Sequence, residues 1–161
     1  MEYLDNPTDR RIIWVVGGEG NEGKTFFVDK IEEKYGRQRV CEIGLDVPTW
    51  YIFEDKVGDV DVAEDIFLFD LSKSVDMQRI NYVLLENIKD GKANVVTGDD
   101  VKRVRFTTPN VIMIFGHEYP DTGKLSSVRW MIFKINSEMQ LEDVTEAQLK
   151  KERDEVENNN W

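Results

Sequence analysis

The sequence predicts an α/β fold with a central, mostly parallel sheet flanked by helices. Short apolar runs alternate with segments in which apolar residues recur at helical spacing, as expected for strands that alternate with helices. Three runs, residues 12–16, 66–69 and 111–115, are apolar throughout, which is typical of strands buried on both faces. With 161 residues, of which 40% are hydrophobic, the chain suits one compact domain.

The first third of the chain predicts a strand, a helix and a second strand. Residues 1–10 are polar and are interpreted as a lead-in or linker. After the strand at residues 12–16, helical spacing of apolar residues predicts a helix over residues 25–35, which Gly36 would end. Residues 40–45 predict the second strand.

The middle of the chain predicts a strand, a helix and a hairpin. Residues 66–70 are an apolar run that ends in an aspartate. Apolar residues then recur at helical intervals over residues 77–88, and Gly91 would end that helix. Residues 93–97 and 101–107 flank a Gly-Asp-Asp turn, which predicts a β-hairpin inserted into the α/β plan.

The last third predicts two strands and a charged helix. Residues 111–115 and 130–135 are the strands, and residues 120–127 form a loop between them. Residues 141–157 are rich in charge and predict a solvated helix. These elements divide the chain into three parts: a lead-in (1–10), a main domain (11–137), and an acidic C-terminal helix and tail (138–161).

The composition excludes several classes of site. The net charge of −11 argues against a protein that coats nucleic acid, so such contacts need a local basic element or a surface built by several subunits. No run is long enough to span a membrane and no signal-peptide pattern is present, so we expect an intracellular protein. One cysteine, Cys41, excludes an internal disulfide and is expected to be a buried strand thiol. One histidine, His117, excludes two-histidine metal sites.

A glycine-rich stretch directly follows the first predicted strand. It matches the phosphate-binding pattern G-x-x-x-x-G-K-[ST] in full, with Gly18, Glu19, Gly20, Asn21, Glu22, Gly23, Lys24 and Thr25. The glycines let backbone N–H groups face the phosphates, and the N-terminus of the next helix favours negative charge. We expect Lys24 to reach the β- and γ-phosphates of an NTP, most simply ATP, and the Thr25 hydroxyl to bind Mg²⁺. The setting between a strand and a helix predicts a P-loop NTPase.

Two polar residues follow other strands and are expected at the same sheet edge, where ligands of open α/β sheets gather. Asp70 is predicted to hold Mg²⁺ through water, and the alternative is an aspartate that caps the next helix. Asp65 begins the same strand, so it is expected at the opposite edge without a role. His117 could approach the γ-phosphate or the attacking water, and a structural histidine is the alternative.

Five blocks of sequence carry a family resemblance over residues 10 to about 135. They are residues 11–15 with 20–25, residues 68–70 with 72–73, the basic hairpin, residues 111–120, and residues 125–130. In order and spacing they resemble the superfamily 3 helicase domain of the replication initiator (Rep) proteins of small circular single-stranded DNA viruses, of the nanovirus-like and circovirus-like branch. The resemblance implies an AAA+-like ATPase that forms a hexameric ring and moves 3′ to 5′ on single-stranded DNA.

The resemblance also assigns roles by position. It implies that Lys24 and Thr25 form the first motif and Asp70 the second. It implies that Arg129 acts in trans, as an arginine finger on a neighbour's ATP. The alternative from the sequence is a surface arginine before the core residue Trp130.

The resemblance implies a DNA-binding surface as well. Lys102, Arg103 and Arg105 would lie on or beside the hairpin that faces the central channel. Residues 101–105 are the one dense basic patch of this acidic chain, and six copies in a ring would present phosphate-binding groups to the channel. Without the resemblance, an ordinary charged hairpin face is the alternative.

The chain departs from the family at two points. His117 stands where the family usually has an asparagine, so hydrolysis could be slow, pH-dependent or lost. A single histidine cannot form the paired-histidine endonuclease site of such initiators. We therefore expect a helicase domain alone, either excised from a longer initiator or a stand-alone relative.

Three functions fit these observations. The first is an ATP- and Mg²⁺-dependent DNA helicase domain, acting as a homo-oligomer on single-stranded DNA in the replication of a virus, within the host nucleus. The second is a non-catalytic or slow nucleotide-binding module that uses ATP to assemble a ring. The third is a small P-loop kinase, although no arginine-rich lid is evident.

Overall fold

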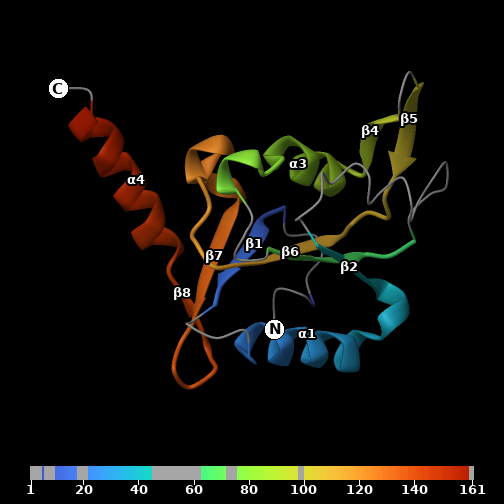
Figure 1. Cartoon of the computed structure of the whole chain (residues 1–161), viewed down its shortest axis with the longest axis horizontal. Coiled ribbons are helices and arrows are strands. Elements are labelled where there is room, and N and C mark those ends of the chain that lie inside the picture. The colour runs from blue at the N-terminus through green and yellow to red at the C-terminus, as the bar shows by residue number, and fades with distance from the viewer. Residues whose placement is uncertain are drawn as a thin grey trace.

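The computed structural model describes residue 5 and residues 10–17, 22–44, 63–71, 76–97 and 100–159. In Figure 1 a sheet lies between a lower helix, α1, and an upper helix, α3, and a further helix, α4, projects from one side. Most of the predicted lead-in and the first half of the glycine-rich stretch lie outside the described residues.

The central sheet has six strands in the order β2-β3-β6-β1-β7-β8. Their bounds are β1 Ile12–Val16, β2 Val40–Gly44, β3 Ile66–Asp70, β6 Val111–Gly116, β7 Trp130–Ile135 and β8 Leu141–Asp143. The first five strands of this order pair in parallel, and β8 pairs antiparallel with β7. The predicted α/β fold with a mostly parallel sheet is therefore confirmed.

Each face of the sheet buries one set of alternate side chains, because a strand points successive residues to opposite faces. In β1, Ile13 and Val15 pack on the face covered by α1 (Glu22–Tyr35), which contributes the fully buried Ile31. Trp14 packs on the other face, with the buried residues of α3 (Tyr82–Asp90). Burial of one large apolar side chain contributes about 1.5–3 kcal/mol, so the two clusters hold both layers to the sheet.

The two main helices end where the sequence predicted. Gly36 follows α1 with φ 88°, and Gly91 follows α3 with φ 94°, both in the left-handed region that favours glycine. The expectation of one helix over residues 77–88 is wrong at its start. A short 3-10 turn, η2 (Met77–Arg79), is followed by a break, and the Asn81 side chain then caps α3 by accepting from the Leu84 N–H at 3.0 Å.

The predicted hairpin is present and forms a separate two-stranded sheet. Strand β4 (Lys92–Thr97) pairs antiparallel with β5 (Asp100–Arg105). Ala93 and Val104 lie opposite each other in this ribbon, and both are buried in the core below α3. Their burial fixes the base of the hairpin, while its far end extends away from the sheet (Figure 1).

The C-terminal segment differs from the single helix predicted over residues 141–157. Its first residues form strand β8, and α4 (Thr145–Asn159) follows. The turn before β8 is built around Asn136, whose side chain accepts from the Glu138 and Gln140 N–H groups at 2.9 Å each. This turn directs the chain back along β7, which charge patterning alone did not indicate. Among the described residues, none of the helices has the length and apolar composition needed to cross a membrane.

Candidate functional site

Three strands end side by side at the carboxyl edge of the sheet, where three of the predicted site residues lie. The N–H of Gly17, after β1, donates to the Gly116 carbonyl at 3.0 Å. The N–H of Leu71, after β3, donates to the Phe115 carbonyl at 2.9 Å. These bonds tie the ends of β1 and β3 to β6, so the loops that follow start from a rigid edge.

Lys24, Asp70 and His117 meet at this edge. The Lys24 ammonium lies 2.6 Å from Asp70 Oδ1 and donates to the Leu71 carbonyl at 3.2 Å. It also lies 3.5 Å from His117 Nε2. The side chain of Lys24 is 9% exposed and that of Asp70 is 68% exposed, so the buried cation is held by an anion that faces solvent. Charge compensation is required because an unpaired buried ammonium is costly.

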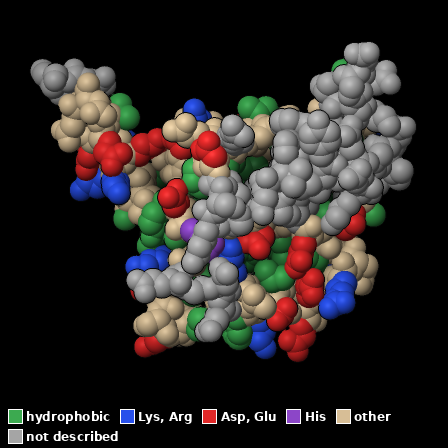
Figure 2. Space-filling model, viewed as in Figure 1, with side chains coloured by type: hydrophobic (Ala, Val, Ile, Leu, Met, Phe, Trp, Pro, Cys, Tyr) green, Lys and Arg blue, Asp and Glu red, His purple; other side chains and the backbone are tan. Residues whose placement is uncertain are grey.

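The backbone around His117 is fixed by Trp14. The indole N–H of Trp14 donates to the Glu118 carbonyl at 3.0 Å. A Cβ on Gly116 would lie 3.2 Å from the same indole nitrogen, so this position favours glycine. His117 is therefore held between two anchored neighbours, half-buried, and the histidine is visible on the face shown in Figure 2.

Two residues at this edge could contribute oxygen ligands to Mg²⁺, whose binding stays a prediction. Within the described part of the chain, no group of three or more His, Cys, Asp or Glu side chains could hold an ion. Mg²⁺ typically takes one or two carboxylates and completes its shell with water and substrate phosphates. Asp70 supplies such a carboxylate at this edge, and Thr25 supplies a hydroxyl on the first turn of α1.

The glycine-rich stretch is described only in part. Gly18, Gly20 and Asn21 lie outside the described residues, and Glu22 is described in its backbone, as the first residue of α1. A Cβ on Gly23 would lie 3.3 Å from Ile135 Cδ1, so glycine lets α1 pack closely against β7. The phosphate contacts themselves stay a prediction.

Asp65 lies at the other end of β3, as expected. It accepts from Arg39 Nε at 3.0 Å and from Nη2 at 2.8 Å, a bidentate pair. This carboxylate raises the pKa of Arg39. Asp65 thus joins the amino end of β3 to the turn before β2, and it contributes to the fold rather than to the site.

The β4–β5 ribbon presents a basic face that the sequence revealed only in part. Arg103 and Arg105 are exposed and two residues apart, so they share a face. Lys92 lies directly opposite Arg105, and Asn94 opposite Arg103. Lys92 was missed because the pairing register of the hairpin cannot be derived from the local sequence. The backbone of Lys102 belongs to β5, and its side chain lies outside the described part.

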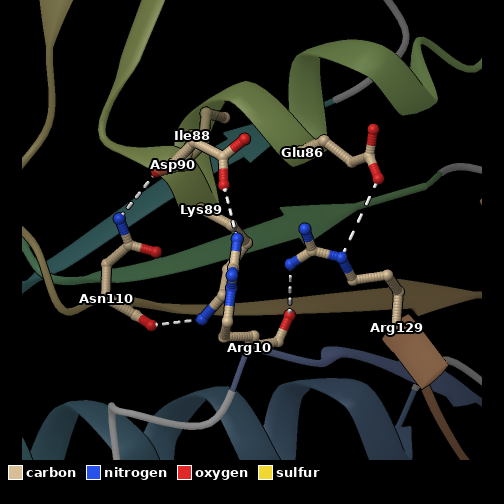
Figure 3. Close-up of polar contacts among 7 residues, drawn as sticks. All are labelled: Arg10, Glu86, Ile88, Lys89, Asp90, Asn110 and Arg129. Carbon is tan, nitrogen blue, oxygen red and sulfur yellow. Dashed lines mark hydrogen bonds and ion pairs between the residues drawn. The ribbon is translucent and has the colours of Figure 1, made fainter.

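Arg129 lies far from the Lys24 cluster of its own chain. It ends the short turn η4 (Ser127–Arg129), immediately before the first residue of β7, at the amino edge of the sheet. Arg129 Nε lies 3.9 Å from Glu86 Oε1, and Nη1 donates to the Arg10 carbonyl at 3.3 Å (Figure 3). The five-residue strand β1 separates the two edges by about 16 Å at ~3.3 Å per residue.

The chain is similar in sequence to viral replication proteins, although no family model matches it. It is 27% identical over 126 residues to the master replication protein of Subterranean clover stunt virus, covering 76% of this chain and 39% of that protein. The master replication proteins of Faba bean necrotic yellows virus and Milk vetch dwarf virus are each 25% identical over 129 residues, covering 78% of this chain and 40% of the relative. Among solved structures, the apo A form of the C-terminal region of NrS-1 aligns with a TM-score of 0.49 and 15% identity, over 80% of this chain and 30% of that one.

These similarities confirm the resemblance to nanovirus replication initiators that the sequence motifs predicted. The chain spans about two fifths of the length of the curated relatives it matches.

Proposed function

We propose that this relative of viral replication proteins is the ATPase domain of a replication initiator, which hydrolyses ATP with Mg²⁺ and moves on single-stranded DNA as a ring. The observation that carries the proposal is the meeting of Lys24, Asp70 and His117 at the carboxyl edge of a parallel sheet. Asp70 follows Lys24 by 46 positions and His117 follows Asp70 by 47 positions. The fold nevertheless brings the three side chains together, beside the glycine-rich stretch. As part of a viral replication initiator, the domain would act in the host nucleus.

The described residues suit distinct steps of such a reaction. Lys24 would bind the β- and γ-phosphates, and Asp70 and Thr25 would hold Mg²⁺, which would supply positive charge at the phosphates. His117 would orient the γ-phosphate or the attacking water from the neighbouring strand end. In the structure Asp70 is paired with Lys24, so the proposed binding of ATP would require the Lys24 ammonium to turn from the carboxylate to the phosphates.

A ring would give a role to the basic hairpin face and to Arg129, which both lie away from this edge. Six copies would bring the faces with Lys92, Arg103 and Arg105 to a central channel, where they bind phosphates of single-stranded DNA. Arg129 is separated from its own chain's Lys24, so it would serve the ATP of the next subunit. An arginine supplied in trans typically contributes ~10³–10⁵ in rate.

The decisive experiment measures ATP hydrolysis with Mg²⁺, with and without single-stranded DNA, for the wild type and for Lys24→Ala. We expect turnover that increases with DNA and that falls to background in the variant, because the phosphates lose their cationic partner. Circular dichroism serves as the folding control. Unchanged turnover in Lys24→Ala would overturn the assignment of the phosphate site.

A second function is favoured by one observation, the histidine at 3.5 Å from the Lys24 ammonium. A histidine at this position differs in reach from the asparagine expected there, so the chain could bind ATP and use it only to assemble a ring. Nucleotide-dependent oligomerisation without turnover, measured by light scattering, would favour this second function over the first.

A further inference from the structure

We propose that Glu86 is a positioning residue for Arg129, holding the guanidinium in the orientation in which it reaches the ATP of the neighbouring subunit. This inference rests on the proposed role of Arg129 in trans. It concerns a residue of α3 that lies outside every motif of the sequence.

The contacts of Arg129 constrain its guanidinium in two places. Glu86 Oε1 faces Nε at 3.9 Å, and the Arg10 carbonyl accepts from Nη1 at 3.3 Å (Figure 3). The side chain is only 18% exposed, although arginine has a long and flexible stem. Since arginine carries five N–H donors, these two contacts leave donors on Nη2 and on the far side of Nη1 for phosphate oxygens.

Glu86 is a suitable anchor because α3 is itself fixed. Asn81 caps its start, and Leu84, Leu85 and Ile88 are buried against the sheet. At its end the Asn110 amide donates to the Ile88 carbonyl at 2.8 Å. The side chain of Glu86 is 35% exposed, so it combines a rigid backbone with access to the surface where Arg129 lies.

A second contact from α3 supports the same arrangement. Asp90 lies four residues after Glu86, so both project from one side of the helix. Asp90 pairs with Arg10 Nη2 at 3.1 Å, and the carbonyl of Arg10 is the other acceptor of Arg129. The helix therefore holds Arg129 directly through Glu86 and indirectly through Arg10.

The ion pair between Glu86 and Arg129 is long, and Glu86 is partly exposed, so we expect it to add little to the free energy of unfolding. A loss of activity in a Glu86 variant can therefore be separated from a loss of stability. A misplacement of about 1 Å in a catalytic group, in contrast, can cost about 100-fold in rate. Loss of Glu86 should therefore leave the fold intact and lower turnover, by about tenfold in kcat, with the KM for ATP changed less than twofold.

The test uses mixtures of two inactive proteins. Lys24→Ala subunits still carry Arg129, and Arg129→Ala subunits still carry Lys24, so mixing them restores ATPase activity at interfaces where an intact Arg129 meets an intact Lys24. Glu86→Ala is then added to one protein at a time. On the Lys24→Ala subunit it should reduce the recovered activity about tenfold, because that subunit supplies the arginine. On the Arg129→Ala subunit it should have no effect.

The controls separate this proposal from the function on which it rests. Glu86→Gln should give an intermediate loss, since it keeps the shape of the side chain and the dipole of its amide oxygen beside the guanidinium but removes the full charge of the ion pair. Glu32→Ala removes a different ion pair, in which Glu32 of α1 lies 3.4 Å from Arg37 just after the helix, and it should leave recovery unchanged on either subunit. Equal effects of Glu86→Ala on both subunits, or none on either, would overturn the positioning role alone. No recovery in the unmodified mixture would overturn the role of Arg129 in trans, and the role of Glu86 with it.

Discussion

Lys24 holds a buried positive charge, and under the proposed function the groups that compensate it would change. In the structure Asp70, the Leu71 carbonyl and His117 surround its ammonium. A nucleotide would replace the carboxylate by phosphate oxygens and free Asp70 for the metal. Asp70 would thus have two roles, one as the partner of Lys24 in the fold and one as the proposed metal carboxylate.

Replacement of Asp70 by asparagine tests both roles. We expect Asp70→Asn to abolish Mg²⁺-dependent ATP hydrolysis and to lower the free energy of unfolding by about 1–3 kcal/mol, less than for a fully buried pair because Asp70 faces solvent. ATPase assays and urea denaturation measure the two effects.

Asp65→Asn is the matched control for this change. It alters the same residue type on the same strand, breaks the pair with Arg39, and should keep Mg²⁺-dependent turnover. Retained turnover in Asp70→Asn would place the metal carboxylate elsewhere. Loss of turnover in Asp65→Asn as well would show that the effect is not specific to Asp70, and it would leave the metal carboxylate unassigned.

The sequence could locate residues that sit in motifs and at strand ends. Asp70 and His117 were identified because each follows a continuous apolar run, and the fold brings them to Lys24 as expected. Glu86 and Lys92 could not be found in this way. Their importance depends on which surface of α3 faces Arg129 and on the register of the hairpin, and both are set by tertiary packing.

At the scale of the element, the β4–β5 ribbon carries an unfavourable charge arrangement. Lys92 and Arg105 are directly opposite each other, and like charges at such positions destabilise a strand pair. Anchoring by Ala93 and Val104 offsets this cost at the base of the hairpin. An anion bound across the pair would relieve the repulsion, as expected for a face that binds phosphates.

Lys92→Ala and Arg103→Ala should each weaken binding of single-stranded DNA and leave ATP affinity unchanged. Removal of one phosphate contact per subunit should also reduce the slope of log affinity against log salt concentration by about 0.7 per contact. Fluorescence anisotropy over a range of salt concentrations measures both quantities. Lys150→Ala, on the exposed face of α4, is the control and should change neither. DNA affinity that is unaffected by both hairpin changes would exclude this face as the DNA site.

None of the described residues of helix α4 is fully buried, and one of its side chains gives the fold a dependence on pH. Desolvation and the neighbouring Asp121 raise the pKa of Glu152, whose side chain lies over Gly123. A carboxyl with a raised pKa binds more protons in the folded than in the unfolded state. Stability should therefore fall as pH rises above the ordinary glutamate value, through the folded pKa.

Glu152→Gln should remove this dependence. We expect the Tm of the variant relative to that of the wild type to be higher at pH 7 than at pH 4, because only the wild type loses stability as the raised pKa of Glu152 is passed. Thermal unfolding at the two pH values measures the difference, and Glu155→Gln, further along α4, should show none. A relative Tm of Glu152→Gln that is no higher at pH 7 than at pH 4 would contradict the inferred cost of burying this charge.

At the scale of the whole molecule, the sequence predicted the order of elements well and their ends less well. Continuous apolar runs identified the parallel strands because these strands are covered on both faces. The C-terminal helix was extended too far because Leu141 and Val144 fit helical spacing as well as they fit a short edge strand. The contacts that decide the matter are non-local, such as the bond from the Ile132 N–H to the Thr145 hydroxyl at 2.8 Å.

The position of Arg129 and Lys24 at opposite edges of one sheet gives the molecule a direction. A contact that brings Arg129 of one copy to the Lys24 site of another can be reciprocal, as in a two-fold dimer, or head-to-tail. Head-to-tail contacts close into a ring or continue as a helix, depending on the rotation between neighbours. A head-to-tail ring, as proposed above, would have a leading and a trailing face, so a subunit that lacks Arg129 would silence the neighbour on one side only.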